Sequence, residues 1–353
     1  PDDILIDSIR HKVRAQIIGH AHLDHVGAVQ FISNRYKAPI YGTPFTNEVL
    51  NSLLKDEDMH LNNQAKTIQP NSSFYIQGKN KKYLAEFVNI THSTPQTSMV
   101  AIHTDEGVVV YANDFKIDDN PVLGLKPNYE RLKQLSKEGV KAVIIDSLYS
   151  GSDRKTPSER IAKHLLEEVL FGIHNNDAGI FVTTFSSHIA RLKSIVEFGK
   201  KLDREIIFLG RSLNKYSEAA KSANISPFMK DVQICAYRRQ VEKVLHKIEK
   251  KRSKYLVVCT GHQGEPGSIL ERLSRNQLPF RFQKNDNLIF SSSVIPTEVN
   301  QENFRKMEEK LKKRYLRIFK DVHVSGHGGR EDLRDIIKIL NPEHIIPSHG
   351  GED

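Results

Sequence analysis

The chain has 353 residues, of which 38% are hydrophobic and 27% are charged, a globular composition at a length that usually forms two domains. No apolar run approaches the roughly 20 residues of a membrane-spanning helix, and two cysteines, Cys235 and Cys259, are too few for a disulfide framework or a thiolate zinc site. The net charge of +9 favours a polyanionic partner, and we expect a cytoplasmic protein that does not bind membranes.

The order of the predicted elements indicates an α/β protein. Short apolar strands are predicted at 15–19, 83–90, 98–104, 107–114 and 141–146, with a helix near 26–36. From about residue 151 strands alternate with long helices, over 178–202, 204–223 and 254–275, which is typical of a parallel sheet with crossover helices. Strands alone return at 286–295, 321–326 and 343–350.

These patterns predict two domains, one inserted into the other. We expect residues 1–150 and 286–353 to form the first domain and residues 151–285 to form the second. The opening residues contain no initiator methionine and have the pattern of a domain interior. We therefore expect N-terminal strands of the first domain to precede Pro1.

The sequence "GHAHLDH", residues 19–25, concentrates metal-binding side chains in one loop. His20 and His22 are two residues apart, so both rings point the same way on an extended loop, whereas Asp24 and His25 diverge from them as a helix begins. One loop can thus serve two neighbouring ions. Further ligands are predicted where polar residues end apolar strands, namely at His92, Asp114, His327 and His349.

This ordered set of motifs resembles a known family. "GHAHLDH", His92, Asp114 and His349 are similar to the metal-binding motifs of the metallo-β-lactamase fold, and Asp146, "SGH" and "SHGG" to those of the β-CASP nucleases. "TGHQGEPGSILERL" and "SGHGGREDL" resemble ribonuclease J, and the archaeal members most closely. The resemblance implies a metallo-β-lactamase αββα sandwich with an inserted β-CASP domain.

The resemblance also implies a role for each of these side chains. One ion would be held by His20, His22 and His92 and the other by Asp24, His25 and His349, with Asp114 bridging them. The ligand set suits two Zn²⁺ ions, and Mn²⁺ is the alternative. A hydroxide between the ions would attack the scissile phosphorus, and the catalytic residues would be Asp24, Asp146 and His327, with His327 as the general acid oriented by Asp146.

The implied activity is that of a 5′→3′ exoribonuclease, acting on single-stranded RNA with a 5′-monophosphate, in a protein that forms a homodimer. The glycine-rich "SGHGGR" stretch would supply N–H groups and one guanidinium to a phosphate. In the strand-to-helix loops of the inserted domain, contact with RNA and a local hydrogen bond are equally weighted alternatives. The expected substrate-binding residues are Ser186, Ser187, His188, His262, Ser325, Gly326, His327, Gly328, Gly329 and Arg330.

Three other functions are weaker alternatives. An endoribonuclease of the cleavage-and-polyadenylation type usually carries N-terminal KH modules, and no GXXG-type KH sequence is present here. A catalytically inactive RNA-binding scaffold tends to lose metal ligands, whereas every expected ligand is present. A small-molecule hydrolase of the same fold would not need the inserted domain.

Overall fold

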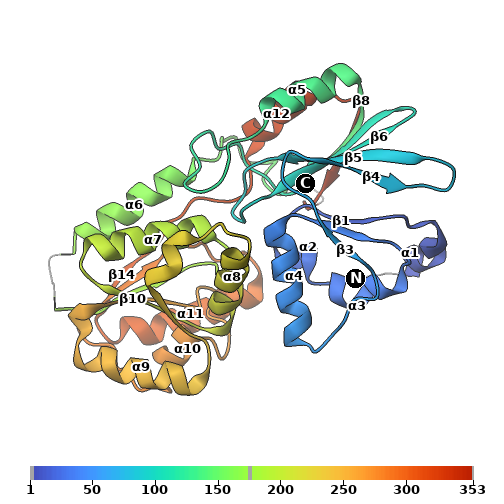
Figure 1. Ribbon diagram of the computed structural model, residues 1–353. Helices are drawn as coiled ribbons and strands as arrows, with labels where there is room; N and C mark the ends of the chain where they lie inside the picture. The colour runs from blue at the N-terminus through green and yellow to red at the C-terminus, as the bar shows by residue number, and fades with distance from the viewer. Residues whose placement is uncertain (1–3, 174–176, 352–353) are drawn as a thin grey trace. The chain divides into compact units, whose positions relative to one another are not determined.

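A computed structural model describes residues 4–173 and 177–351 (Figure 1). The chain forms two compact units, one made of residues 1–158 together with 325–353 and the other of residues 159–324. The second unit is therefore an insertion within the first. Among the described residues, none of the helices combines the length and the hydrophobicity that crossing a membrane would require.

The first unit contains two sheets. A parallel sheet has the strand order β1-β2-β3, and a mixed six-stranded sheet has the order β15-β8-β7-β6-β5-β4. Its strands are β1 (Gln16–Ile18), β2 (Ile40–Gly42), β3 (Ala65–Thr67), β4 (Ser73–Gln77), β5 (Lys82–Asn89), β6 (Ser98–Thr104), β7 (Gly107–Tyr111), β8 (Val140–Asp146) and β15 (His344–Ser348). Its helices are α1 (Ile4–Ile9), α2 (Leu23–Val26), α3 (Val29–Ile32), α4 (Pro44–Asp56), α5 (Tyr129–Glu138) and α12 (Arg330–Leu340).

Hydrophobic alternation explains how these sheets pack. In β4, Phe74 and Ile76 are buried while Tyr75 between them is 63% exposed, because successive side chains point to opposite faces of a strand. One core cluster joins β4 and β5 to Tyr41 of β2, between the two sheets. Another joins the opposite face of the mixed sheet to α5 and α12. With α4 on the outer side of the small sheet, the layers are helix, sheet, sheet and helix, as expected (Figure 1).

The second unit is a parallel sheet covered by helices on both faces. Its strand order is β11-β10-β12-β9-β13-β14, and every pair is parallel. The strands are β9 (Ile180–Thr183), β10 (Glu205–Leu209), β11 (Val232–Cys235), β12 (Tyr255–Cys259), β13 (Asn287–Phe290) and β14 (Arg317–Phe319). The helices are α6 (Glu159–Phe171), α7 (Ile189–Lys201), α8 (Arg211–Ser222), α9 (Arg238–Lys250), α10 (Ile269–Ser274) and α11 (Glu298–Lys312).

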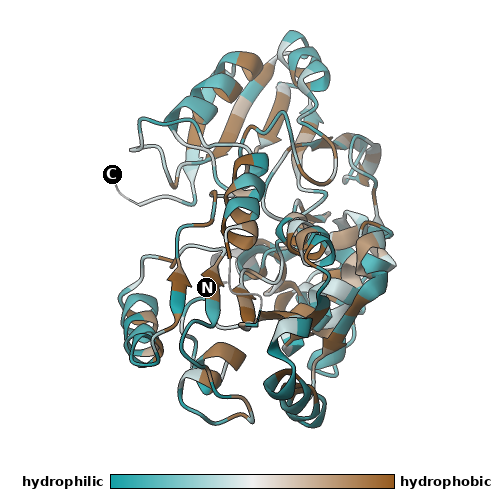
Figure 2. Ribbon diagram, turned by 90° about the vertical axis from the view of Figure 1, so that its left-hand side faces the viewer, coloured by the Kyte–Doolittle hydropathy of each residue, from teal (hydrophilic) through white to brown (hydrophobic). Residues whose placement is uncertain are grey.

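The two faces of this second sheet carry different helices. The helices α6, α7 and α8 pack together on one face, whereas α9, α10 and α11 contribute to the core cluster on the other. The strands are coloured as hydrophobic along most of their length, and the helices carry their hydrophilic residues on one side (Figure 2). The parallel pairing of every strand, together with helices on both faces, confirms the predicted parallel sheet with crossover helices.

Three local predictions differ from the structure. The helix expected near 26–36 is instead α2, α3 and a 3₁₀ turn over Ser33–Arg35. The segment 321–326 forms no strand, because Val322 O accepts hydrogen bonds from the side chains of Arg191 and Ser291 instead of pairing with a neighbouring strand. The second unit extends to Val324 rather than to residue 285, since β13 and β14 belong to its sheet.

Candidate metal centre

The candidate ligands all belong to the first unit and follow strands that end at one edge. The strands β5, β7, β8 and β15 run in the same direction, since β6 is antiparallel to both β5 and β7 and the later pairs are parallel. His92, Asp114 and His349 follow three of these strands, while the 19–25 loop follows β1. Three groups of side chains that could hold a metal ion result, and all share Asp114: His20, His22, His92 and Asp114; Asp24, His25, Asp114 and His349; and Asp114, Asp146 and His327.

In the first group, ring nitrogens of three histidines converge on one another. The Nε2 atoms of His20 and His92 lie 3.2 Å and 3.0 Å from Nδ1 of His22. His92 Nδ1 lies 2.7 Å from Gly326 O, which can only accept, so Nδ1 carries the proton and Nε2 presents a lone pair. His20 Nδ1 likewise donates to Asn113 Oδ1 at 3.0 Å. The Nε2 lone pairs of His20 and His92, which are directed at His22 Nδ1, fit a bound cation.

The electrostatics of the first group agree with that geometry. Burial lowers the pKa of His22 and of His92 well below the ordinary histidine value, and the neighbouring imidazoles lower both further. Neither ring is therefore protonated at neutral pH. Burial also opposes the charge of Asp114, but the adjacent His20 and His25 outweigh burial and hold the pKa of this carboxyl well below its usual range. The group thus presents neutral imidazoles and one carboxylate, as a divalent cation requires.

The second group is more open. His25 Nε2 lies 3.1 Å from Asp114 Oδ2 and 3.6 Å from Asp24 Oδ2. The His349 ring nitrogens lie 4.0 Å from the same two carboxylates. Asp24 is 57% exposed, whereas Asp114 is 2% exposed. Two carboxylates and two imidazoles fit a second divalent cation, and Asp114 is the side chain common to both groups.

Asp146 and His327 form the third group with Asp114, and they are also bonded to each other. Asp146 Oδ2 lies 2.7 Å from His327 Nδ1, and its other oxygen accepts from the backbone N–H of Leu148. The His327 ring lies against the rings of His92 and His349, at centroid distances of 5.0 Å and 5.5 Å. Burial lowers the pKa of His327, but the hydrogen bond and the charge of Asp146 outweigh burial, so the pKa of His327 lies above the ordinary histidine value. Asp146 therefore fixes the ring and leaves Nε2 available for proton transfer.

Some residues that support the site are missing from the sequence prediction. Asn113 is 2% exposed, has a left-handed φ of 63°, and holds His20 with its side-chain oxygen. An asparagine directly before the candidate ligand Asp114 could have indicated a left-handed turn at this position, because asparagine tolerates a positive φ. Ser93, whose Oγ lies 3.3 Å from His22 Nε2, is next to His92 in the sequence.

The glycine-rich stretch differs from the expected phosphate cradle. The N–H groups of residues 327, 328 and 329 donate to Ser325 Oγ, Phe115 O and Asp332 Oδ2. These three amides are therefore occupied within the chain. The Arg330 guanidinium is also engaged, because it donates to Ser150 O and pairs with Asp153.

Close packing explains the glycines of this stretch better than a bound phosphate does. A Cβ on Gly326 would lie 2.8 Å from Ser93 Oγ, and one on Gly329 would lie 2.2 Å from Arg154 O. Neither glycine has a positive φ. They let the loop approach His92, whose Nδ1 reaches the backbone of Gly326.

The expected substrate contacts of the second unit have different environments. Ser186 is half-buried and Ser187 is buried. His188 is 2% exposed and begins α7, where Nδ1 accepts from the Arg191 N–H and Nε2 lies 3.3 Å from Glu159. The structure favours the local-hydrogen-bond alternative for His188.

His262 has a different environment. Burial lowers its pKa to about 4, and its ring packs edge-on against Phe185 at a centroid distance of 4.1 Å. Among the described residues, neither ring nitrogen of His262 has a hydrogen-bond partner. A buried imidazole without partners fits contact with a ligand better than a structural role.

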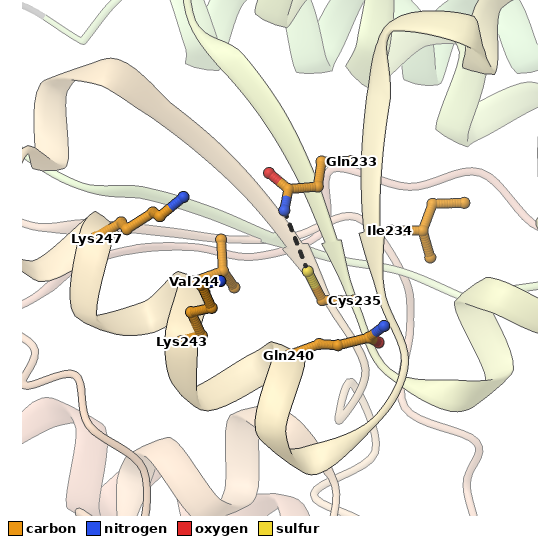
Figure 3. Close-up of a pocket in the computed structure, with 7 residues that line it drawn as sticks. All are labelled: Gln233, Ile234, Cys235, Gln240, Lys243, Val244 and Lys247. Atoms are coloured by element: carbon orange, nitrogen blue, oxygen red, sulfur yellow. Dashed lines mark hydrogen bonds between the residues drawn. The ribbon is translucent and has the colours of Figure 1, made fainter.

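Neither cysteine is a candidate ligand. Cys235 and Cys259 are free and buried, and both belong to the second unit. Cys235 lies in a cavity between β11 and α9, where it accepts a 3.7 Å hydrogen bond from the Gln233 amide (Figure 3). Burial raises the pKa of both thiols. The candidate centre consists of imidazoles and carboxylates.

Comparison with known proteins places the chain in a family. Residues 177–311 match the family described as "Ribonuclease J, beta-CASP domain", and residues 313–353 match the "Zn-dependent metallo-hydrolase RNA specificity domain". Ribonuclease J of Methanocaldococcus jannaschii is 40% identical over 99% of this chain and 78% of its own length. Ribonuclease J of Pyrococcus abyssi is 42% identical over 99% of this chain and 76% of its own length.

A solved structure shows the same fold at low sequence identity. A protein of unknown function from Enterococcus faecalis has a TM-score of 0.63 and 15% identity, over 95% of this chain and 75% of its own. The archaeal relatives share the sequence over nearly the whole chain, and the family matches cover the β-CASP and metallo-hydrolase parts. The chain therefore belongs to the ribonuclease J family.

Proposed function

We propose that this chain shortens single-stranded RNA from a 5′-monophosphate end in the 5′→3′ direction, with two divalent metal ions at the candidate metal centre. Metal-dependent ribonuclease activity in general follows from membership of the ribonuclease J family. The observation that carries the proposal is the convergence of the His20, His22 and His92 ring nitrogens beside Asp114, which a second group of candidate ligands shares.

Two groups of ligands around one carboxylate support a two-ion site. His20, His22 and His92 would hold one ion and Asp24, His25 and His349 the other, with Asp114 contacting both. The absence of thiolates suits Zn²⁺ or Mn²⁺, and we propose Zn²⁺. When bound, such ions neutralise charge on a scissile phosphate and bring the pKa of water towards neutrality.

The side chains of the chain position the substrate and move a proton. Asp146 holds His327 through Nδ1 at 2.7 Å, so that Nε2 can donate a proton to the leaving oxygen of the phosphodiester. We propose that His327 and Ser325 contact the scissile phosphate and that His262, which has no hydrogen-bond partner among the described residues, contacts the RNA. We also propose that the protein forms a homodimer and is located in the cytoplasm.

One degradation assay separates the possible activities. The substrate is one RNA prepared with 5′-monophosphate, 5′-hydroxyl or 5′-triphosphate ends and labelled at its 3′ end, incubated with Zn²⁺ or Mn²⁺. We expect progressive shortening of the monophosphate RNA. We also expect no cleavage by His22→Ala and normal cleavage by His246→Ala, which alters an exposed imidazole of α9.

Two results would contradict parts of the proposal. Internal cuts that do not depend on the 5′ group would show an endonuclease instead. No cleavage by a chain that carries its full complement of metal would remove the proposed ribonuclease activity altogether.

A further inference from the structure

A cavity of the second unit lies where its sheet connections diverge. From β10 the chain continues through α8 to β11, on one side, whereas from β12 it continues through α10 towards β13, on the other. β10 and β12 are neighbours in the sheet, so their connections leave in opposite directions. In parallel α/β sheets, ligands bind beyond the carboxyl ends of strands at such a divergence.

The residues that line this cavity come from the ends of three strands. It has a volume of about 500 Å³, which is within the range of ligand sites in proteins. Gly210 follows β10, Ala236 follows β11 and Thr260 follows β12, and all three residues line it. Only glycine fits at position 210, because its φ is 130° and a Cβ would lie 2.9 Å from the Thr260 side chain.

Three arginines line the cavity, and two of their guanidinium groups make no hydrogen bond or ion pair within the described residues. Arg211 and Arg272 make no side-chain hydrogen bond or ion pair with any described residue, while Arg238 pairs with Glu242 at 2.8 Å. The only acidic side chain among the lining residues is Glu265. One oxygen of Glu265 accepts a hydrogen bond from the Gln263 N–H, so this carboxylate is held within its own loop.

The position of two of these arginines is electrostatically unfavourable without an anion. Arg211 and Arg238 are the first residues of α8 and α9, at the helix ends where the backbone dipole disfavours positive charge. Neither helix has an acidic residue in its first turn, and the residue before α8 is Gly210, which provides no side-chain cap. A bound anion would satisfy the arginines and the free N–H groups of α8 together.

We propose that this cavity binds a phosphate group through Arg211, Arg238 and Arg272. Guanidinium groups match phosphate oxygens in paired hydrogen bonds, which the planar fork of arginine supplies. The phosphate group could belong to the backbone of an RNA or to a free phosphate or nucleotide. The proposal does not depend on the activity of the candidate metal centre, because every lining residue belongs to the second unit.

The test compares two variants that lose the same charge. Arg211→Gln/Arg272→Gln removes the unpaired arginines, and Arg239→Gln/Lys250→Gln removes two exposed positive charges of α9 that do not line the cavity. Far-UV circular dichroism verifies that both variants are folded. Calorimetric titrations with inorganic phosphate and adenosine 5′-monophosphate use chelator-treated full chain, so that metal does not contribute binding.

The RNA source is tested separately. Fluorescence anisotropy measures binding of a labelled 5′-hydroxyl RNA in a His22→Ala background, which prevents cleavage. We expect the cavity variant to weaken binding by roughly tenfold for each arginine removed, and the control variant by less than about threefold.

Each outcome identifies the ligand or overturns the proposal. Loss of phosphate and nucleotide binding with unchanged RNA binding supports a free ligand. Weakened RNA binding, in a chain that binds neither small probe, supports contact with the RNA backbone. The proposal is overturned if the cavity variant binds every probe as the control variant does, or if the parent chain binds none of them.

Discussion

Arg191 is fully buried in the second unit, and its replacement tests how this unit is held together. Its guanidinium forms a two-point contact with Glu159, at 2.6 Å and 2.9 Å, and also donates to Ser291 O at 2.8 Å and to Val322 O at 3.2 Å. Glu159 is the first residue of the unit and Val322 is near its last. One side chain thus connects both ends of the inserted segment.

The expected effect of Arg191→Met is a large loss of stability. Removing one partner of a buried ion pair costs about 3–5 kcal/mol, because the other charge stays buried without compensation. Here the remaining Glu159 side chain is 5% exposed and keeps His188 Nε2, at 3.3 Å, as a neighbouring partner. The two carbonyls add little, because Ser291 O still accepts from Thr184 Oγ1 and Val322 O from Ser291 Oγ. A loss of about 3–5 kcal/mol is a large share of the whole unfolding free energy of a typical domain.

Chemical denaturation with two additional variants checks this reasoning. Because the chain contains no tryptophan, unfolding in urea is followed by far-UV circular dichroism, and limited proteolysis identifies which unit has opened. Arg191→Met/Glu159→Gln removes the uncompensated charge and is expected to recover part of the loss. Arg305→Met, which breaks exposed ion pairs of α11, is expected to cost less than about 1 kcal/mol.

Two results would refute the argument about Arg191. A loss below about 1 kcal/mol for Arg191→Met would mean that the buried charge of Glu159 is accommodated without its partner. A double variant no more stable than Arg191→Met would mean that the buried charge of Glu159 is not the source of the loss.

Two further predictions concern the first unit. Replacing Asn113 with alanine removes the acceptor that orients His20, and we expect metal affinity, measured by competition with a chelator, to fall about 10–100-fold while the fold is retained. Burial raises the pKa of Glu86, but hydrogen bonds with Arg131 outweigh burial, so the pKa of Glu86 in the folded chain is lowered overall. The contribution of Glu86 to stability is therefore present above the unfolded pKa of about 4.3, and it is lost as pH falls through the lower folded pKa. In urea unfolding between pH 6 and pH 3, Glu86→Gln should therefore make the free energy of unfolding less dependent on pH. Glu130→Gln, an exposed change on α5, should leave that dependence as it is in the parent chain.

Much of the architecture is readable from local sequence patterns. The apolar runs that become β6, β8 and β12 are continuous or alternating over four or more residues, and a strand period is a property of neighbouring positions. The helices that follow strands in the second unit are identifiable for the same reason. The helix expected after "GHAHLDH" is interrupted at Gly27, where a Cβ would lie 2.4 Å from Leu23 O.

The candidate ligands are also visible in the sequence, but their surroundings are not. His20, His22, Asp24 and His25 share one short loop, so their spacing alone indicates metal binding. The acceptors that fix the protonated nitrogens of His20 and His92 are Asn113 and Gly326, which are distant in the chain. Such pairs form only when separate strands assemble into one sheet.

The sequence by itself determined the α/β class, the ligand residue types and the resemblance to the ribonuclease J family. Only the tertiary structure decided that His188 is buried against Glu159, that the "SGHGGR" amides are already bonded, and that three arginines from separate segments line one cavity. The physical reason is the range of the interactions involved. Secondary structure depends on residues a few positions apart, whereas burial, tautomer and charge partner depend on which distant segments come into contact.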